Sequence, residues 1–201
     1  MTAQAHPLNL SEALWRPAAG PAAAALRAAV LLAAGCCLLT VSAKVQIPFY
    51  PVPVTLQTFV LLVLGMAYGL RLATATATAY LAAGAAGAPV FAGGAGWAYV
   101  SGPTGGYLAG FVLAMALMGA LGDRGWGRSL LGMLAPMLLG TLVIFACGVG
   151  WLASLIGWEK AVAGGLYPFI PGEAAKIVLA TLLVPTVWKL TQPDDGAARG
   201  G

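Results

Sequence analysis

Two ionisable residues, Glu173 and Lys176, stand inside an apolar stretch near the end of the chain. They are three positions apart, so on a helix both side chains lie on one face. Pro171 and Gly172 precede them and are typical of a helix start. The pair could bind a ligand, or it could be a structural ion pair at a helix end; Glu173 alone could also relay protons.

A proline-rich segment, residues 44–58 (KVQIPFYPVPVTLQT), precedes an apolar stretch. Its three prolines rule out a continuous helix. Its hydrogen-bonding side chains include those of Gln46, Thr55, Gln57 and Thr58. The Gln57 amide can both donate and accept, which suits a neutral polar ligand. The alternative is an ordinary turn that caps the next helix.

A glycine-rich segment, residues 84–106, contains eight glycines together with Phe91, Trp97 and Tyr99. Flexible backbone with a few aromatic rings is typical of a lid over a small molecule. The alternative is an aromatic belt at the membrane interface. The segment lacks the GxxxxGK[ST] and GxGxxG patterns, so the sequence offers no recognisable ATP site.

The composition places all these segments in a membrane. Hydrophobic residues make up 60% of the 201 residues and charged residues only 8%, against about 25% charged in soluble domains. So few charges cannot cover the surface of a soluble globule of this size. The three cysteines lie in apolar runs and His6 is the only histidine, so we expect no metal site, no catalytic residues and no cofactor. The basic residues form no run, which argues against a nucleic-acid partner.

Six apolar stretches could each form a membrane-spanning helix. They cover residues 22–41, 54–68, 72–86, 105–121, 130–151 and 172–190. The third and fourth come from one uncharged run of 51 residues, which the glycine-rich segment divides. The sequence therefore predicts an all-α membrane protein with six transmembrane helices and a long glycine-rich loop between helices 3 and 4.

The distribution of Lys and Arg predicts the orientation. With the N-terminus in the cytoplasm, seven of these residues fall on the inner side, and Lys44 and Lys160 fall on the outer side. Both termini are then cytoplasmic, and the glycine-rich loop is outside. This gives a cytoplasmic tail over residues 1–21, a membrane domain over 22–190 and a second cytoplasmic tail over 191–201.

Small residues line one face of the first predicted helix. Ala25, Ala29 and Ala33 are four positions apart, which allows another helix to approach closely. The partner could be a neighbouring helix of this chain or another subunit.

Three motifs together resemble the BioY family, the biotin-specific substrate-binding S components of energy-coupling factor (ECF) transporters. They are IPFYPVPVTLQT at 47–58, GAPVFAGGAGW with GPTGGYLAGF between 87 and 111, and PFIPGEAAK at 168–176. The resemblance implies a six-helix subunit, not itself an enzyme, in a bacterial cytoplasmic membrane. It would capture biotin from outside and act with a transmembrane coupling subunit and cytoplasmic ATPase subunits.

The resemblance also implies a set of functional residues. The biotin-binding candidates are Thr55, Gln57, Gly94, Tyr107, Glu173 and Lys176. The lid or pocket aromatics are Phe91, Trp97, Tyr99 and Tyr167, and the coupling subunit would meet Ala25, Ala29 and Ala33. Two alternatives remain: an S component for another small vitamin, and a proton-coupled carrier that uses Glu173 and needs no partner.

Overall fold

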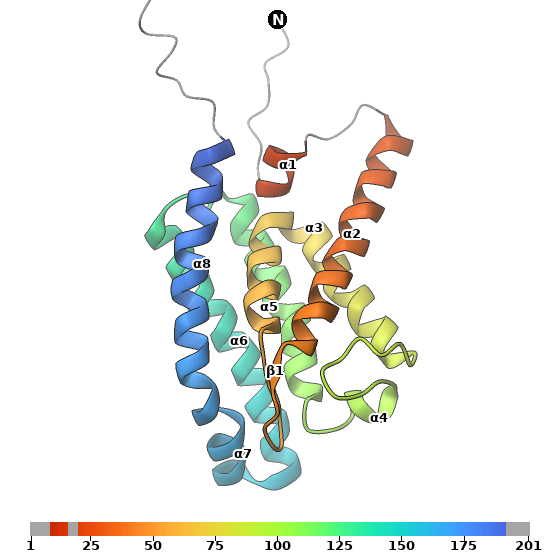
Figure 1. Ribbon diagram of the computed structural model, residues 1–201, viewed down its shortest axis with the longest axis vertical. Helices are drawn as coiled ribbons and strands as arrows, with labels where there is room; N and C mark the ends of the chain where they lie inside the picture. Colours follow the sequence, from red (N-terminus) through yellow and green to blue (C-terminus); the bar gives the residue numbers. More distant parts are fainter. Residues whose placement is uncertain (1–8, 16–19, 192–201) are drawn as a thin grey trace, which may run out of the picture.

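The computed structural model describes residues 9–15 and 20–191, so most of both predicted tails lies outside the described part. The elements are α1 (Leu10–Leu14), α2 (Pro21–Lys44), β1 (Gln46–Ile47), β2 (Val54–Thr55), α3 (Gln57–Ala85), α4 (Trp97–Val100), α5 (Gly105–Asp123), α6 (Leu130–Ile156), α7 (Trp158–Gly165), the 3-10 helix η1 (Tyr167–Phe169) and α8 (Ile170–Thr191). Figure 1 shows the long helices running roughly side by side, with α1 and the hairpin at opposite ends.

The helix α3 contains two helical segments that meet at Gly69. This glycine has φ 75° and ψ 168°, a conformation that L side chains rarely adopt. The chain turns back there, near α1, and the second segment descends behind α2 (Figure 1). The Asp123 carboxylate accepts a hydrogen bond from the Leu70 backbone N–H at 2.9 Å and one from the Asn9 amide at 3.1 Å. Asp123 therefore holds the first turn of the second segment and fixes the reversal.

The core lies between α3 and α5, the two helices that share the most extensive contact. Glycines allow this close approach: a Cβ at Gly119 would lie 2.6 Å from the Gly69 carbonyl carbon, and one at Gly122 would lie 2.4 Å from the Met66 carbonyl oxygen. Met115 and Met118 are completely buried in the same layer. The small residues of α5 thus position the segment that carries Gln57 and Thr58.

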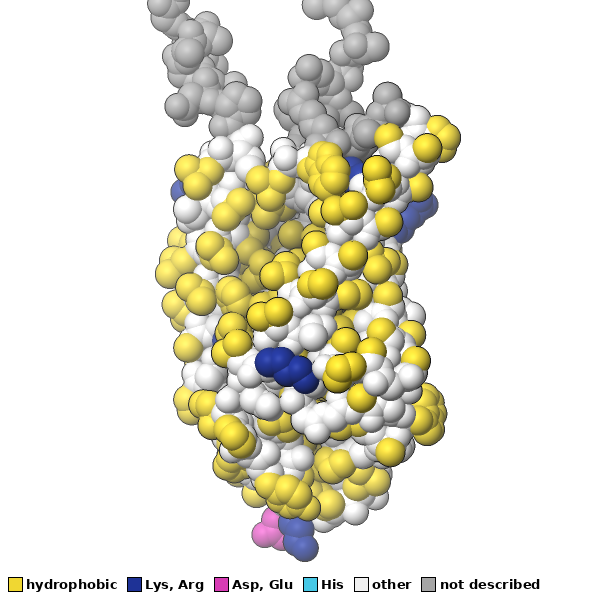
Figure 2. Space-filling model, turned by 45° about the vertical axis from the view of Figure 1, so that its right-hand side comes forward, with side chains coloured by type: hydrophobic (Ala, Val, Ile, Leu, Met, Phe, Trp, Pro, Cys, Tyr) yellow, Lys and Arg dark blue, Asp and Glu magenta, His cyan; other side chains and the backbone are white. Residues whose placement is uncertain are grey.

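The outer surface is apolar. Within the described residues, five helical stretches are long and apolar enough to cross a membrane: α2, α3, α5, α6 and the stretch from α7 through α8. Large side chains such as Leu131 and Leu190 are 78% and 81% exposed. Hydrophobic side chains are spread over the whole face in Figure 2, and charged ones are few. Such a surface requires lipid around it, as the composition predicts.

The helix α2 is the least embedded of the long helices, with 11% of its most apolar window buried. Ala25, Ala29 and Ala33 all lie exposed on it, so no helix among the described residues covers them. The short helix α1 lies within the stretch predicted as a tail. Arg27 of α2 holds α1 in place by donating to the backbone oxygen of Trp15 at 2.9 Å.

The prediction of an all-α chain needs one correction, because residues 46–55 form a small antiparallel hairpin. Its two strands pair Gln46 with Thr55 and Ile47 with Val54. The prolines between them prevent helix formation, as the sequence predicts. The hairpin leads directly into α3 and so brings Thr55 and Gln57 to the end of the bundle opposite α1 (Figure 1).

Candidate ligand-binding site

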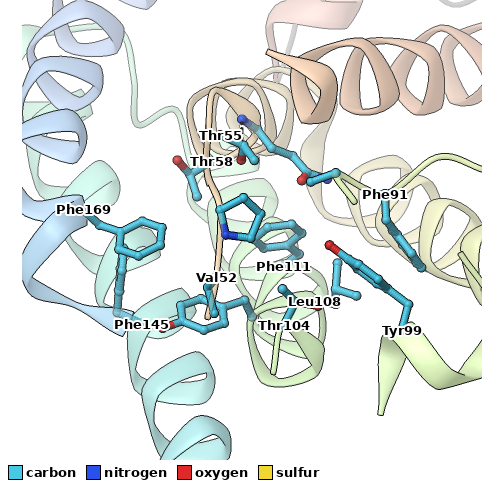
Figure 3. A pocket seen from close by; sticks show the side chains of 14 residues that line it. Val52, Thr55, Thr58, Phe91, Tyr99, Thr104, Leu108, Phe111, Phe145 and Phe169 are labelled. Atoms are coloured by element: carbon cyan, nitrogen blue, oxygen red, sulfur yellow. Dashed lines mark hydrogen bonds between the residues drawn. The ribbon is translucent and has the colours of Figure 1, made fainter. Parts of the chain in front are cut away.

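A cavity lies at the hairpin end of the bundle. Fourteen residues line it: Val52, Pro53, Thr55, Gln57, Thr58, Phe91, Ala92, Tyr99, Thr104, Tyr107, Leu108, Phe111, Phe145 and Phe169. Figure 3 shows Phe91 and Tyr99 on one side and Phe145 and Phe169 on the other, with Val52 between them. Aromatic walls with a few polar groups are typical of a site for a small, partly apolar molecule.

The glycine-rich loop builds one aromatic wall. Phe91 is 1% exposed and stacks on Tyr99 with ring centroids 5.1 Å apart. The Tyr80 ring of α3 meets the edge of Phe91 at 5.5 Å. Gly84 makes room for this arrangement, because a Cβ there would lie 2.1 Å from the Phe91 ring. The loop is therefore anchored to α3 by its aromatic side chains.

Helices α5 and α6 and the 3-10 helix build the opposite wall. The Tyr107 ring packs parallel to Phe169 at 6.3 Å and edge-on to Phe145 at 5.8 Å. The Tyr107 hydroxyl donates to the Gly165 carbonyl oxygen at 2.6 Å. Tyr107 thus connects α5 to the turn that leads from α7 into α8.

We expect Gly148→Ala to weaken this second wall. A Cβ at Gly148 would lie 2.3 Å from the Tyr107 ring, so the ring must move. Overpacking of this kind costs about 1–3 kcal/mol, which should appear as a lower unfolding temperature of the detergent-purified protein and weaker ligand binding. Gly150→Ala is the matched control in the same helix, because nothing lies within 4 Å of a Cβ there. Equal destabilisation by both variants would contradict the expected role of Gly148.

Polar groups enter the cavity mainly from the start of α3. The Gln57 side chain is 4% exposed and its amide nitrogen donates to the Tyr80 hydroxyl at 2.8 Å. That hydroxyl donates in turn to the Val90 carbonyl oxygen at 2.7 Å. The Gln57 carbonyl oxygen has no protein partner among the described residues, so it can accept a hydrogen bond from a ligand.

Glu173 and Lys176 form a buried ion pair next to the cavity, with 2.7 Å between Nζ and Oε1 and side chains 7% and 11% exposed. Thr58 joins the pair: its hydroxyl donates to Glu173 at 2.8 Å and accepts from Lys176 at 2.9 Å. Lys176 also donates to the Thr55 carbonyl oxygen at 2.5 Å. The pair therefore connects α8 to the hairpin and α3, and it reaches the cavity through Thr58.

The structure brings some of the predicted site residues together and separates others. Thr55, Gln57, Tyr107, Phe91 and Tyr99 line the cavity. Glu173 and Lys176 do not line the cavity themselves but contact Thr58, which does. Gly94 leaves room for the Tyr99 ring, since a Cβ at Gly94 would lie 2.5 Å from that ring. Trp97 and Tyr167 are 73% and 62% exposed and do not line the cavity.

Sequence reasoning missed Val52, Phe111, Phe145 and Phe169 among the lining residues. Phe145 looks like an ordinary apolar residue of a long helix, and no local pattern separates it from lipid-facing neighbours. The other three had a usable signal, because each belongs to one of the motifs that carry the resemblance: Val52 at 47–58, Phe111 at 102–111 and Phe169 at 168–176.

The side chains that line the cavity offer aromatic rings, hydroxyl groups and one amide. These groups suit a partly apolar molecule that also forms hydrogen bonds. Within the described residues no group of three or more His, Cys, Asp or Glu side chains could hold a metal ion.

A membrane-type helical bundle with such a cavity at one end defines a membrane protein that binds a small molecule. The chain belongs to the BioY family, whose sequence model matches residues 13–193. It is similar to the biotin transporter BioY of Thermotoga maritima, with 37% identity over 155 residues, 76% of this chain and 90% of that one. The biotin transporter BioY of Rhizobium etli is 34% identical over 169 residues, 79% of this chain and 87% of the relative.

One solved structure has a similar fold. It is the S-component for biotin from an ECF-type ABC transporter, with a TM-score of 0.73 and 27% sequence identity. The match covers 85% of this chain and 95% of that chain. The family is thus a class of transporter subunits rather than of enzymes.

Proposed function

We propose that this protein is the substrate-binding S component of an ECF transporter, captures biotin at the outer face of a bacterial cytoplasmic membrane and takes part in its uptake. The observation that carries the proposal is the aromatic cavity with the free Gln57 acceptor, in a chain whose relatives are named biotin transporters. Coupling and ATPase subunits would supply the energy, and the chain itself would need no cofactor.

The proposed topology has six membrane crossings, with the two segments of α3 counted separately. The turn at Gly69 supports this count. The first segment, residues 57–68, spans only about 18 Å at about 1.5 Å per residue, so the hairpin before it would complete that crossing. The excess of Lys and Arg at the α1 end supports cytoplasmic termini, tails over 1–21 and 191–201, and an outward-facing cavity.

The chemistry of biotin matches the cavity in a specific way. Its ureido ring has two N–H donors and a carbonyl acceptor, which could meet the Gln57 oxygen and the Thr55 and Thr58 hydroxyls. Its apolar sulfur-containing ring fits between the walls that carry Phe91 and Tyr107. Glu173 and Lys176 would act as positioning residues, because they hold Thr58.

The exposed face of α2 is the proposed contact with the coupling subunit. Ala25, Ala29 and Ala33 support this assignment because they are small and exposed.

Calorimetric titration of biotin into the detergent-purified chain tests the function. We expect saturable one-to-one binding of biotin, at least about 100-fold tighter than that of thiamine, which corresponds to about 2.7 kcal/mol. Thiamine controls for non-specific uptake of a small vitamin. Tighter binding of thiamine would point to an S component for another vitamin, and uptake driven by a pH gradient in vesicles that hold the chain alone would favour a proton-coupled carrier.

A further inference from the structure

Lys44 lies at the rim of the cavity. It is the last residue of α2, and its ammonium group donates to the Phe91 carbonyl oxygen at 2.5 Å. Two residues later, the Gln46 amide donates to the Ala92 carbonyl oxygen at 3.2 Å. Phe91 and Ala92 both line the cavity. The exposed Lys44 is therefore bonded to the backbone of a lining residue, whereas Glu173 and Lys176 contact the lining residue Thr58.

The two lysines near the cavity, Lys44 and Lys176, differ in how many hydrogen bonds their ammonium groups donate. An ammonium group has three donors. Lys176 uses all three, on the Thr55 carbonyl oxygen, the Thr58 hydroxyl and the Glu173 carboxylate. Lys44 uses one, on a neutral carbonyl, and its side chain has no carboxylate partner among the described residues. Lys44 is thus the ammonium that can still bind an anion.

The charges around the cavity leave an excess of one positive charge. Glu173 and Lys176 neutralise each other, so Lys44 is uncompensated. Of the other acidic residues described, Glu12 and Asp123 lie at the α1 end, and Glu159 is exposed on α7. A site with this charge is complementary to a ligand that carries a single negative charge.

We infer that Lys44 binds the carboxylate of the ligand and makes the site selective for monoanionic carboxylates. A bond between two ions is stronger than one from an ammonium group to a neutral carbonyl, so the carboxylate takes the place of the Phe91 oxygen or shares the ammonium with it. The inference rests on the proposed function and adds the orientation: the tail of biotin points to Lys44 at the rim, and the ureido ring points to Gln57 and Thr58.

A comparison of biotin with its neutral amide, biotinamide, tests this inference. We expect the unmodified protein to prefer biotin by about 10- to 100-fold, the range for a hydrogen bond to a charged group. In Lys44→Gln, which keeps a donor for the Phe91 carbonyl but removes the charge, the affinity for biotin should fall to that for biotinamide. Biotinamide binding should stay within about twofold of the unmodified protein, which also shows that the variant is folded.

Two further variants sharpen the result. Lys44→Arg should retain the preference for the acid, and Lys160→Gln, which removes an exposed lysine of α7, should leave it unchanged. Equal losses of both ligands in Lys44→Gln would overturn the inference, as would an unmodified protein that binds the acid and the amide equally. In both cases biotin still binds and the proposed function stands, whereas failure of the unmodified protein to bind biotin would reject both.

Discussion

Lys176→Met should destabilise the protein and abolish tight ligand binding. The substitution keeps most of the length of the side chain but leaves the Glu173 carboxylate buried, with only the Thr58 hydroxyl as a partner among the described residues. Removing one partner of a buried ion pair costs about 3–5 kcal/mol. The Thr55 carbonyl oxygen also loses its lysine donor, so the hairpin loses this hydrogen bond to α8. The unfolding temperature in detergent and a biotin titration measure the two effects.

The double variant Glu173→Gln with Lys176→Met separates the effect of the buried charges on stability from the effect of the pair on the position of Thr58. It removes both charges, so most of the lost stability should return. Ligand affinity should stay at least about tenfold low, because a neutral pair no longer fixes Thr58 against the cavity. Lys189→Met, an exposed lysine near the end of the same helix, is the control and should behave like the unmodified protein. Full stability of the Lys176→Met single variant would contradict the structural role assigned to the pair.

The helices could be predicted from the sequence because their signals are local. Apolar runs bounded by glycine and proline predicted a helix over 105–121, for example, and α5 covers Gly105–Asp123. The sequence does not show how consecutive helices join. No residue pattern shows that the chain reverses at Gly69 with no loop between the two segments, since the reversal depends on Asp123, which lies 53 residues from Leu70 in the sequence.

The candidate site was predictable only where its residues share a short motif. Glu173 and Lys176 contact each other because positions i and i+3 of a helix are neighbours. Their third partner, Thr58, lies 115 residues from Glu173, and only the packing of α8 against α3 brings the two together. The free donors of Lys44 were likewise invisible, because they depend on where the Phe91 carbonyl lies.

The aromatic residues of the glycine-rich loop show the same limit. On the sequence, Phe91, Trp97 and Tyr99 are equivalent lid candidates. The structure separates them by exposure: Phe91 is 1% exposed and lines the cavity, whereas Trp97 is 73% exposed. The difference arises because the Phe91 ring fits over Gly84, while Trp97 begins the short helix α4 at the surface.

Phe91→Ala should therefore have a large effect and Trp97→Ala almost none. Truncating a buried phenylalanine costs about 3–5 kcal/mol, and here Tyr99 and Tyr80 both lose the ring they pack against. With one wall of the cavity gone, we expect biotin affinity to fall at least about tenfold, because the ring no longer covers apolar ligand surface. Thermal unfolding and calorimetric titration of the two variants side by side provide the measurement.

Trp97→Ala controls for the loss of any aromatic ring from this loop, and it should stay within about twofold of the unmodified protein in affinity. Phe91→Leu adds a test of what the ring contributes: leucine restores much of the buried volume and hence stability, but it cannot replace the stacking on Tyr99. Affinity should then recover less than stability does. If Trp97→Ala weakens binding as much as Phe91→Ala, the ligand is covered from the exposed side of the loop, and the cavity lined by Phe91 is not where it binds.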